Sequence, residues 1–291
     1  MRGADLRSGK THRDENFPVA SLLLAPEHRK PILAFYAFAR AADDVADHAS
    51  LAPADKLAVL DRLEAGLDGA AGAENEAVAL REALAQRGLP DCHARALLQA
   101  FRQDATLNRY HSWLELMDYC AFSAMPVGRF VLDVHGEPRA ARTASDAICA
   151  ALQIINHLQD CALDYRQLDR VYLPLDMLRR EGACVEDLGR ERASQGLRNC
   201  IQNIAARADC LLDAGESFAT QIRNQRLARE IAVIIALARN NANRLRVEDP
   251  LQGGGRTRRP QAFFITLSTL LRMLTRNSLA PQKRRFDDAG A

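Results

Sequence analysis

Three aspartates crowd the end of an apolar, alanine-rich run, FYAFARAADDVADHAS at residues 35–50. Like charges this close repel one another and contribute nothing to helix stability, so their presence requires a chemical explanation. On a helix, one polar stripe steps by 4, 3 and 4 residues and consists of Tyr36, Arg40, Asp43 and Asp47, with Asp44 beside it. The neighbouring alanine, phenylalanine, leucine and valine side chains favour burial. We therefore expect the stripe to face a cavity.

A second stripe lies in LQIINHLQDCALDYRQLDRVYLP at residues 152–174. Its members step by 3, 4 and 4 residues and are Gln153, Asn156, Asp160 and Asp164. Leucine and isoleucine flank them, and burial of such polar groups without partners costs several kcal/mol. A cation held in a cavity is the partner that fits two aspartates on one helix face.

The two stripes together predict a diphosphate site. Carboxylate oxygens suit Mg²⁺, which proteins hold with one or two carboxylates, waters and substrate phosphates. Arg40 and Arg170 offer forked donors for the same diphosphate. The competing interpretation is a pair of unrelated, salt-bridged helix faces exposed to solvent. A calcium-binding loop is disfavoured, because the aspartates lie on helices and not in a glycine-containing loop.

Helical periodicity dominates the segments that must position these residues. The sequence predicts helices at 27–48, 53–68, 74–87, 91–107, 112–124, 126–135, 139–166, 174–181, 196–217, 224–247 and 261–275. No convincing alternating strand is present. The glycine run at 253–255 precedes RTRRP, which fits a flexible linker and not a phosphate-binding loop. We therefore expect one all-α domain over residues 1–250, followed by a linker and a basic C-terminal segment over 251–291.

Composition narrows the function classes. The formal net charge is +2, which disfavours a nucleic-acid binder, although residues from Pro250 onward carry +6. Seven scattered cysteines form no CxxC pair, and together with the absence of a secretory signal they favour reduced thiols in the cytoplasm. The longest apolar run, IAVIIALA at 231–238, is too short to span a bilayer.

The two aspartate motifs, YAFARAADDVAD and NHLQDCALDY…DRVYLP, resemble those of the squalene/phytoene synthase family. The resemblance covers roughly residues 15–245 and includes YCAFSAMPVGRFVLDVHG at 119–136. It implies an all-α isoprenoid-synthase helical bundle around a central cavity and a reaction in which Mg²⁺ helps to remove diphosphate from a prenyl chain. By position, the implied metal ligands are Asp43, Asp47, Asp160 and Asp164, with Asp44 as a less certain neighbour. The resemblance assigns diphosphate surroundings to Arg40, Gln153, Asn156, Arg170 and Tyr172, and cavity tyrosines to Tyr36 and Tyr119.

Three departures from the common family pattern narrow the resemblance. Gln159 stands where many members carry arginine, ENFPVAS at 15–21 replaces a serine-rich segment, and the central motif is Pro126-Val127-Gly128-Arg129. Together they resemble the hopanoid-pathway branch, hydroxysqualene synthase, which ionises presqualene diphosphate and lets water capture the cation. Gln159 and Asn156 are candidates for holding that water. The alternatives are a presqualene diphosphate synthase that joins two farnesyl diphosphates, a more distant phytoene synthase, and a non-catalytic assembly factor on the same fold.

The expected partners follow from a lipid substrate. The stretch FFITLSTLLRML at 263–274 is amphipathic and lies in the basic segment, which predicts peripheral contact with anionic membrane on the inner face. A final helix packed on the bundle is the equally weighted alternative. The resemblance also implies that the product passes to a downstream squalene-forming oxidoreductase.

Overall fold

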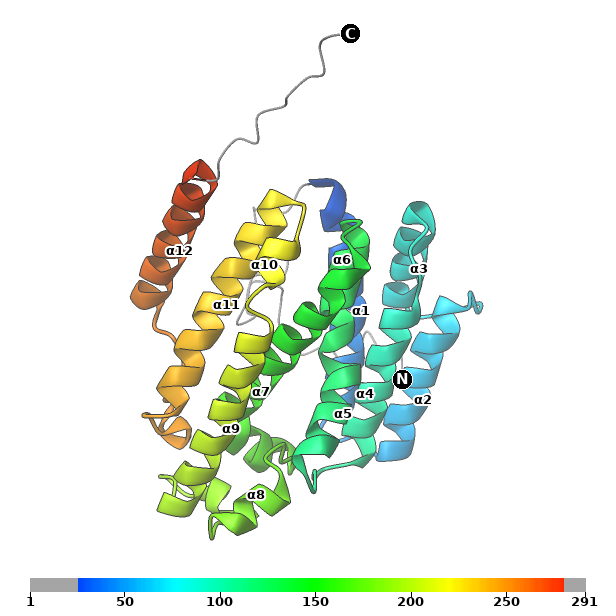
Figure 1. Cartoon of the computed structure of the whole chain (residues 1–291). Coiled ribbons are helices and arrows are strands. Elements are labelled where there is room, and N and C mark those ends of the chain that lie inside the picture. The colour runs from blue at the N-terminus through cyan, green and yellow to red at the C-terminus, as the bar shows by residue number, and fades with distance from the viewer. Residues whose placement is uncertain (1–25, 280–291) are drawn as a thin grey trace.

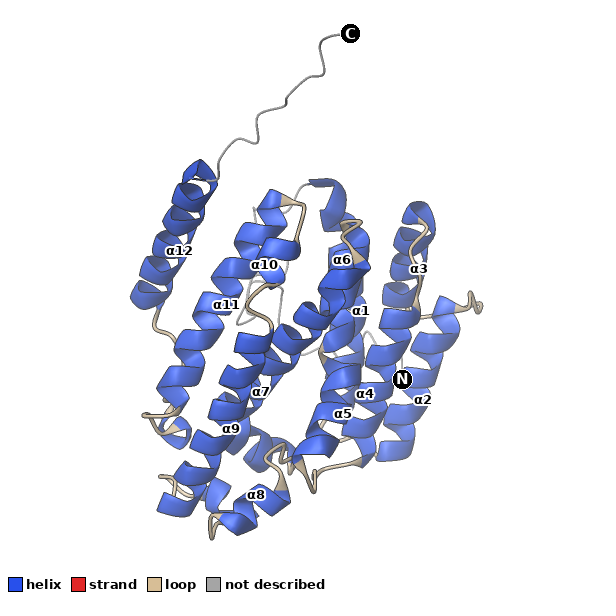
Figure 2. Ribbon diagram, in the orientation of Figure 1, coloured by secondary structure: helices blue, strands red, loops and turns tan. Residues whose placement is uncertain are grey.

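The computed structural model describes residues 26–279, and over this part of the chain it is a bundle of α-helices without a β-strand (Figures 1 and 2). The α-helices are α1 (Pro26–Ala46), α2 (Pro53–Leu67), α3 (Asn75–Arg87), α4 (Cys92–Thr106), α5 (Trp113–Ser123), α6 (Met125–Val134), α7 (Arg142–Leu168), α8 (Leu175–Arg180), α9 (Gln195–Ala214), α10 (Phe218–Gln221), α11 (Gln225–Leu245) and α12 (Arg259–Leu279). Short 3-10 helices are η2 (Arg139–Ala141), η3 (Val185–Gly189) and η4 (Pro250–Gln252). The all-α prediction is confirmed. The segment at 15–21 and the basic residues beyond 279 lie outside the described residues.

Local sequence signals explain where several helices begin and end. Pro53 occupies the first turn of α2, where its missing N–H is not needed. Gly88 ends α3 in the left-handed conformation, with φ of 61°. Ser112 and Ser194 accept hydrogen bonds from backbone N–H groups in the first turns of α5 and α9. The predicted helix ranges therefore agree with the observed ones to within a few residues.

The 27-residue helix α7 is the centre of the bundle. It packs against α5, α6, α9 and α11, while α1 packs against α3, α4 and α6 (Figure 1). At Gly215, just past α9, an added Cβ would lie 2.5 Å from Ile148 of α7. This close approach requires glycine at the point where α9 ends, three residues before the end of the predicted helix 196–217, and the short α10 that follows was not predicted.

The C-terminal part of the described chain differs from the expected flexible linker. Gly253 and Gly255 have positive φ, and the turn that they form folds back onto the bundle. The Gln159 amide of α7 donates to the Gly255 carbonyl at 2.7 Å, and the Thr257 N–H donates to Asn241 of α11 at 2.8 Å. The glycine run, which predicts a flexible linker from the sequence, here forms a defined turn because glycine readily adopts positive φ. The division of the chain into two parts near residue 250 stays a prediction.

Helix α12 packs along the outer side of α11, at the edge of the bundle (Figure 1). None of the helices within residues 26–279 has the combination of length and hydropathy that a membrane span requires.

Candidate active site

The first aspartate cluster lies at the C-terminal end of α1. Arg40 forms ion pairs with both Asp43 and Asp44, each at 2.9 Å. Asp47 follows the helix by one residue, and its N–H donates to the Asp43 carbonyl at 2.9 Å. The spacing predicted from sequence therefore holds: the guanidinium group lies one turn before the carboxylates and divides its charge between two of them.

The second motif reaches the first through the turn that ends α7. Asp169 stops the helix in the left-handed conformation, with φ of 49°, which is rare outside glycine and tolerated by aspartate. Arg109 braces this turn through an ion pair with Asp169 at 2.5 Å. The chain then reverses and places Arg170 against Asp47, at 2.8 Å. The two motifs, which are 123 residues apart at this contact, meet in one ion pair.

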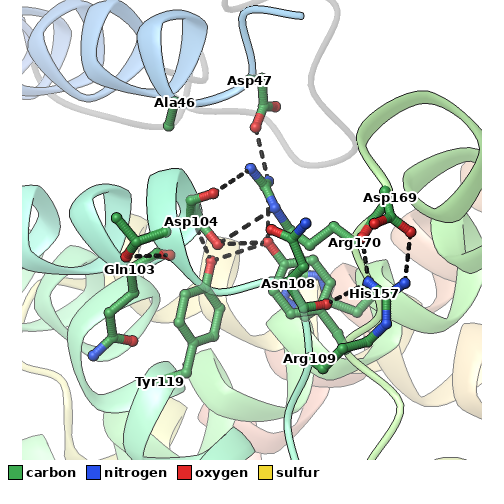
Figure 3. A network of polar contacts seen from close by, with 12 residues as sticks. Ala46, Asp47, Gln103, Asp104, Asn108, Arg109, Tyr119, His157, Asp169 and Arg170 are labelled. Atoms are coloured by element: carbon green, nitrogen blue, oxygen red, sulfur yellow. Dashed lines mark hydrogen bonds and ion pairs between the residues drawn. The ribbon is translucent and has the colours of Figure 1, made fainter. Parts of the chain in front are cut away.

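A buried polar network surrounds Arg170, as Figure 3 shows for Asp47, Asp104 and Tyr119. Arg170 donates to the Asp104 backbone carbonyl at 2.9 Å. The hydroxyls of Tyr119 and Tyr172 donate to the two carboxylate oxygens of Asp104, each at 2.8 Å. Hydrogen bonds to a buried charged group are among the strong ones. The network therefore fixes the guanidinium group beneath the first aspartate motif.

His157 belongs to the same network through its ring. It stacks on Tyr172 with ring centroids 3.5 Å apart, and one ring nitrogen lies 3.0 Å from the amide nitrogen of Gln153. Burial, and then the charge of Arg170, lower the pKa of His157 to about 3. The imidazole is therefore neutral at physiological pH and adds no further positive charge beside Arg170.

The aspartates divide into two groups by exposure, and the division suggests two roles. The side chains of Asp43, Asp47 and Asp160 are 32%, 38% and 30% exposed, and Asp164 is half-buried on the same face of α7. The side chains of Asp44 and Asp104 are only 6% and 4% exposed. We call the first four the mouth carboxylates and the last two the anchoring carboxylates. Of these six described aspartates, the mouth carboxylates are the ones accessible to a ligand, so Asp44 is better placed to hold Arg40 than to bind a metal.

Mutual repulsion acts on the mouth carboxylates. Burial, and then the neighbouring Asp47, raise the pKa of Asp43 to about 8, against the attraction of Arg40. Burial, and then Asp160, raise the pKa of Asp164 to about 7. Two carboxylates on different helices thus resist ionisation in the absence of a further positive charge.

This donor set fits a hard divalent cation, because it offers carboxylate oxygens whose repulsion a cation would relieve. Within residues 26–279, however, no three histidine, cysteine, aspartate or glutamate side chains already converge as a metal cluster. Three of the four mouth carboxylates are paired with arginines: Asp43 with Arg40, Asp47 with Arg170 and Asp160 with Arg256.

An apolar cavity of about 440 Å³ opens beneath Arg40 and Asp43. Its walls come from α1, α4, α6, α7, α10 and α11, and include Phe35, Phe101, Phe130, Ile148, Leu152, Phe218 and Ile231. The volume lies in the range of about 300–1,000 Å³ that is usual for small-molecule sites. A charged mouth over an apolar cavity suits an amphiphile with an anionic head and a hydrocarbon chain.

Comparison with known proteins identifies the family. Residues 10–261 match the family described as squalene/phytoene synthase. The chain belongs to this family. It is 55% identical over 248 residues to the hydroxysqualene synthase of Rhodopseudomonas palustris, a match that covers 85% of each chain. It is 51% identical over 250 residues to the hydroxysqualene synthase of Sinorhizobium fredii, covering 86% of each chain.

Solved structures agree with the family assignment. The squalene synthase HpnC from Alicyclobacillus acidocaldarius is 34% identical, with a TM-score of 0.69 over 79% of this chain and 87% of that one. A dehydrosqualene synthase in complex with a ligand has a TM-score of 0.78 over 94% of this chain and 96% of that one. At 19% identity this second structure supports the fold alone. The isoprenoid-synthase fold and the family resemblance are confirmed, and the chain is a prenyl-diphosphate-processing synthase.

The predicted site residues of this squalene/phytoene synthase lie in three places: the cavity wall, the Asp104 network and helix α7. Tyr36, Arg40 and Asp43 line the apolar cavity. Tyr119 and Tyr172 are buried in the Asp104 network and do not line it, so their rings face aromatic neighbours instead of the chain-binding walls.

The remaining predicted residues lie on α7. Gln153 lies beside His157, and Asn156 is half-buried one turn before Asp160. Gln159 points toward the Gly255 turn. Its side chain is a structural anchor for the C-terminal turn in this arrangement.

Sequence reasoning missed three residues of the site: Asp104, His157 and Arg256. Asp104 occurs on α4 within an unremarkable FRQDAT stretch, and nothing in its spacing relates it to either motif. Arg256 follows the glycine run and reaches Asp160 only because the turn folds back. His157 was open to prediction, since it lies four residues after Gln153 and three before Asp160 on the same helix face.

Proposed function

We propose that the chain is a hydroxysqualene synthase, which converts presqualene diphosphate and water to hydroxysqualene and diphosphate. The observation that carries the proposal is the juxtaposition of paired arginines and carboxylates with an apolar cavity. Relatives that are 49–55% identical over most of the chain bear this name, and they support the same substrate.

The head of the substrate belongs at the mouth. Mg²⁺ held by Asp43, Asp47, Asp160 and Asp164 would act as a Lewis acid on the leaving diphosphate. Arg40 and Arg170 would donate to phosphate oxygens and stabilise the charge that develops as the carbon–oxygen bond breaks. The anchoring carboxylates keep both guanidinium groups oriented while they do so, because each arginine has a buried acid as a second partner.

The chain of the substrate belongs in the cavity. Phenylalanine, leucine and isoleucine walls bind hydrocarbon and exclude stray water from the cation. Tyr36 lies in the wall below the mouth, where its ring can stabilise positive charge by cation–π contact. The phenylalanines Phe35 and Phe130, stacked at 4.0 Å, line the same cavity and were not among the predicted aromatics.

The alternative within the family is a presqualene diphosphate synthase that condenses two farnesyl diphosphates, and phytoene synthase activity is more distant at about 30% identity. These activities use the same mouth. A non-catalytic assembly factor is disfavoured, because such a protein would have no use for four aspartates and two arginines arranged around a cavity.

The first experiment offers the purified protein Mg²⁺ with either presqualene diphosphate or farnesyl diphosphate, without NADPH, and identifies products by mass spectrometry. We expect a C30 alcohol from presqualene diphosphate and no reaction of farnesyl diphosphate. Presqualene diphosphate formed from farnesyl diphosphate would move the protein to the condensing branch. Asp43→Asn and Asp160→Asn should each abolish turnover with helicity unchanged. Asp118→Asn, at an exposed aspartate of α5, is the matched control.

We also propose peripheral contact of α12 with anionic membrane. Phe263 and Phe264 are 64% and 67% exposed on this outer helix, and the exposed Arg258 and Arg259 precede them. Exposed aromatic side chains beside cations suit the interface of an anionic bilayer. A lipid product, passed on to a squalene-forming oxidoreductase, would leave the protein at such a surface.

Vesicle co-sedimentation of the full chain tests the contact. Phe263→Ser with Phe264→Ser should reduce binding to vesicles that contain phosphatidylserine, while Leu114→Ser, at an equally exposed apolar residue on α5, should not. Equal binding of both variants would refute the membrane role of α12.

A further inference from the structure

One face of α11 lines the apolar cavity, and it contains an acid. Leu227, Ile231 and Ile234 recur at helical spacing and form the apolar part of this face. Glu230 occupies the same face between them, lines the same cavity and is only 6% exposed. An alternation of leucine and isoleucine with one glutamate is the pattern of a hydrophobic wall that carries a single polar group.

Glu230 lies on α11, a helix that carries none of the mouth carboxylates. At the N-terminal end of α11, the N–H groups of Arg223 and Asn224 donate to Glu137 at 2.8 Å each, near the start of α7. At the other end, Asn241 accepts from Thr257, in the turn whose Arg256 reaches Asp160. Glu230 precedes Asn241 by eleven residues, a helical rise of about 16 Å. Glu230 therefore belongs to the apolar wall that α11 contributes to the cavity, and not to the group of mouth carboxylates.

Burial at this position is energetically unfavourable for a charged carboxylate. Glutamate is rarely buried to this extent, and the desolvation of its charge costs several kcal/mol before any partner is counted. Leucine or isoleucine at position 230 would complete the wall, so packing alone does not account for glutamate there.

The reaction needs one polar group beside the hydrocarbon in the cavity. If the proposed function is right, a carbocation forms in the cavity and one water must reach it and lose a proton. Gln159, one of the two candidates from sequence, is tied to Gly255 and does not line the cavity. A buried carboxylate attracts positive charge and accepts a hydrogen bond from water, which are the two properties that the capture step requires.

We propose that Glu230 holds and deprotonates the water that captures the carbocation. The bond between the substrate carbon and the diphosphate oxygen breaks, and its electron pair leaves with diphosphate. A lone pair of the water then forms the new carbon–oxygen bond. The released proton goes to the Glu230 carboxylate and from there to solvent. The alcohol, the diphosphate and the proton account for all atoms of the substrate and the water.

The test separates ionisation from capture. Glu230→Gln keeps the size of the side chain without the base, and Glu230→Leu completes the apolar wall. For each variant, diphosphate release and C30 products from presqualene diphosphate are measured together in ¹⁸O-labelled water. We expect the fraction of turnovers that yields labelled hydroxysqualene to fall at least tenfold, with elimination products or other alcohols in its place. Glu216→Gln, at an exposed glutamate after α9, is the control.

The outcomes distinguish this inference from the function on which it rests. Wild-type protein that makes no hydroxysqualene from presqualene diphosphate would refute the proposed function. Wild-type protein that makes it, together with an unchanged product ratio in either folded Glu230 variant, would overturn the role of Glu230 alone. Circular dichroism identifies the folded variants, and Glu230→Asp, which withdraws the carboxylate by one methylene, provides a further variant with an intermediate product ratio as the expected result.

Discussion

Asp43→Asn should make the metal-free protein more stable, although it should abolish activity. Asp43 is held near Asp47 and is repelled by it, and the pKa of Asp43 rises from 3.8 to about 8 because of burial and this repulsion. Asparagine removes the charge and keeps the shape. Arg40 retains Asp44 as an ion-pair partner at 2.9 Å. The substitution therefore removes an unfavourable charge without leaving a buried guanidinium group unpaired.

The size of the effect follows from the pKa and the exposure. A rise from 3.8 to about 8 corresponds to about 6 kcal/mol if it acts fully on stability. Because 32% of the side chain is exposed and water screens its charge, we expect about 1–2 kcal/mol. The folded-state pKa lies above the unfolded one, so the native state binds the extra proton. Wild-type protein thus loses stability as pH rises from about 4 to about 8, and the advantage of Asp43→Asn grows over the same window.

Asp44→Asn is the matched comparison and should have the opposite sign. The Asp44 side chain is 6% exposed and pairs with Arg40. Loss of a buried partner leaves part of the guanidinium charge uncompensated, and because Arg40 keeps Asp43 we expect a loss of about 1–3 kcal/mol.

Urea unfolding and thermal unfolding, both in EDTA at pH 5 and pH 8, measure the free energy of unfolding and the melting temperature of both variants. At pH 8 the melting temperature of Asp43→Asn should rise by about 2–6 °C, at about 2–3 °C per kcal/mol for a chain of this size. If Asp43→Asn were less stable than wild type by more than about 1 kcal/mol at pH 8, the Arg40 pair would dominate. The interpretation of the mouth as a strained acidic site would then be wrong.

Further predictions concern the network, the cavity wall and the cation. Tyr119→Phe removes a hydrogen bond to the buried Asp104 carboxylate, and urea unfolding should show a loss of about 1.5–3 kcal/mol in the free energy of unfolding. Tyr110→Phe is the control and should leave the free energy of unfolding unchanged, because the buried Tyr110 hydroxyl has no hydrogen-bond partner among the described residues. Gly128→Ala places a Cβ 2.4 Å from the Ser145 hydroxyl, between α6 and α7, and should cost about 1–3 kcal/mol; an added Ser145→Ala should restore part of this loss. Mg²⁺ should raise the melting temperature more at pH 8 than at pH 6, because Asp43 and Asp164, with pKa values of about 8 and about 7, must lose protons to bind it. A larger rise at pH 6 would contradict the metal assignment.

The fold could be predicted from sequence because its signals are local. Apolar residues at helical spacing, proline in first turns and glycine at Gly88 define the helices without knowledge of their neighbours. The two polar stripes were also visible, since Asp43 and Asp160 each belong to a run of polar residues on one helix face. On a long helix, residues that share one face recur every three or four positions, so the sequence alone shows that they lie together.

The rest of the site depends on contacts that sequence spacing does not encode. Asp104 joins the network because α4 packs beside α1 and α5, and a single aspartate in a helix gives no sign of this. Arg256 was assigned to a linker, and its contact with Asp160 depends on a turn that Gln159 holds 96 residues earlier in the chain. Gln159 was interpreted through the family pattern, whereas in the structure its amide donates to the Gly255 carbonyl, outside both aspartate motifs.

The division of the acids into mouth and anchoring groups bears on how the site can bind both cations and diphosphate. Asp43 and Asp47 now pair with Arg40 and Arg170, which would also be the ligands of the diphosphate. Cations and arginines therefore compete for the same carboxylates. Once cations occupy the carboxylates, each guanidinium group gains free donors for phosphate oxygens and remains held by its buried acid, Asp44 or Asp104. The arginine pairs thus keep the acidic mouth folded before the ligands arrive, and the anchoring carboxylates keep the arginines in place afterwards. This is why a conservative change at Asp44 and one at Asp43 should have opposite effects on stability.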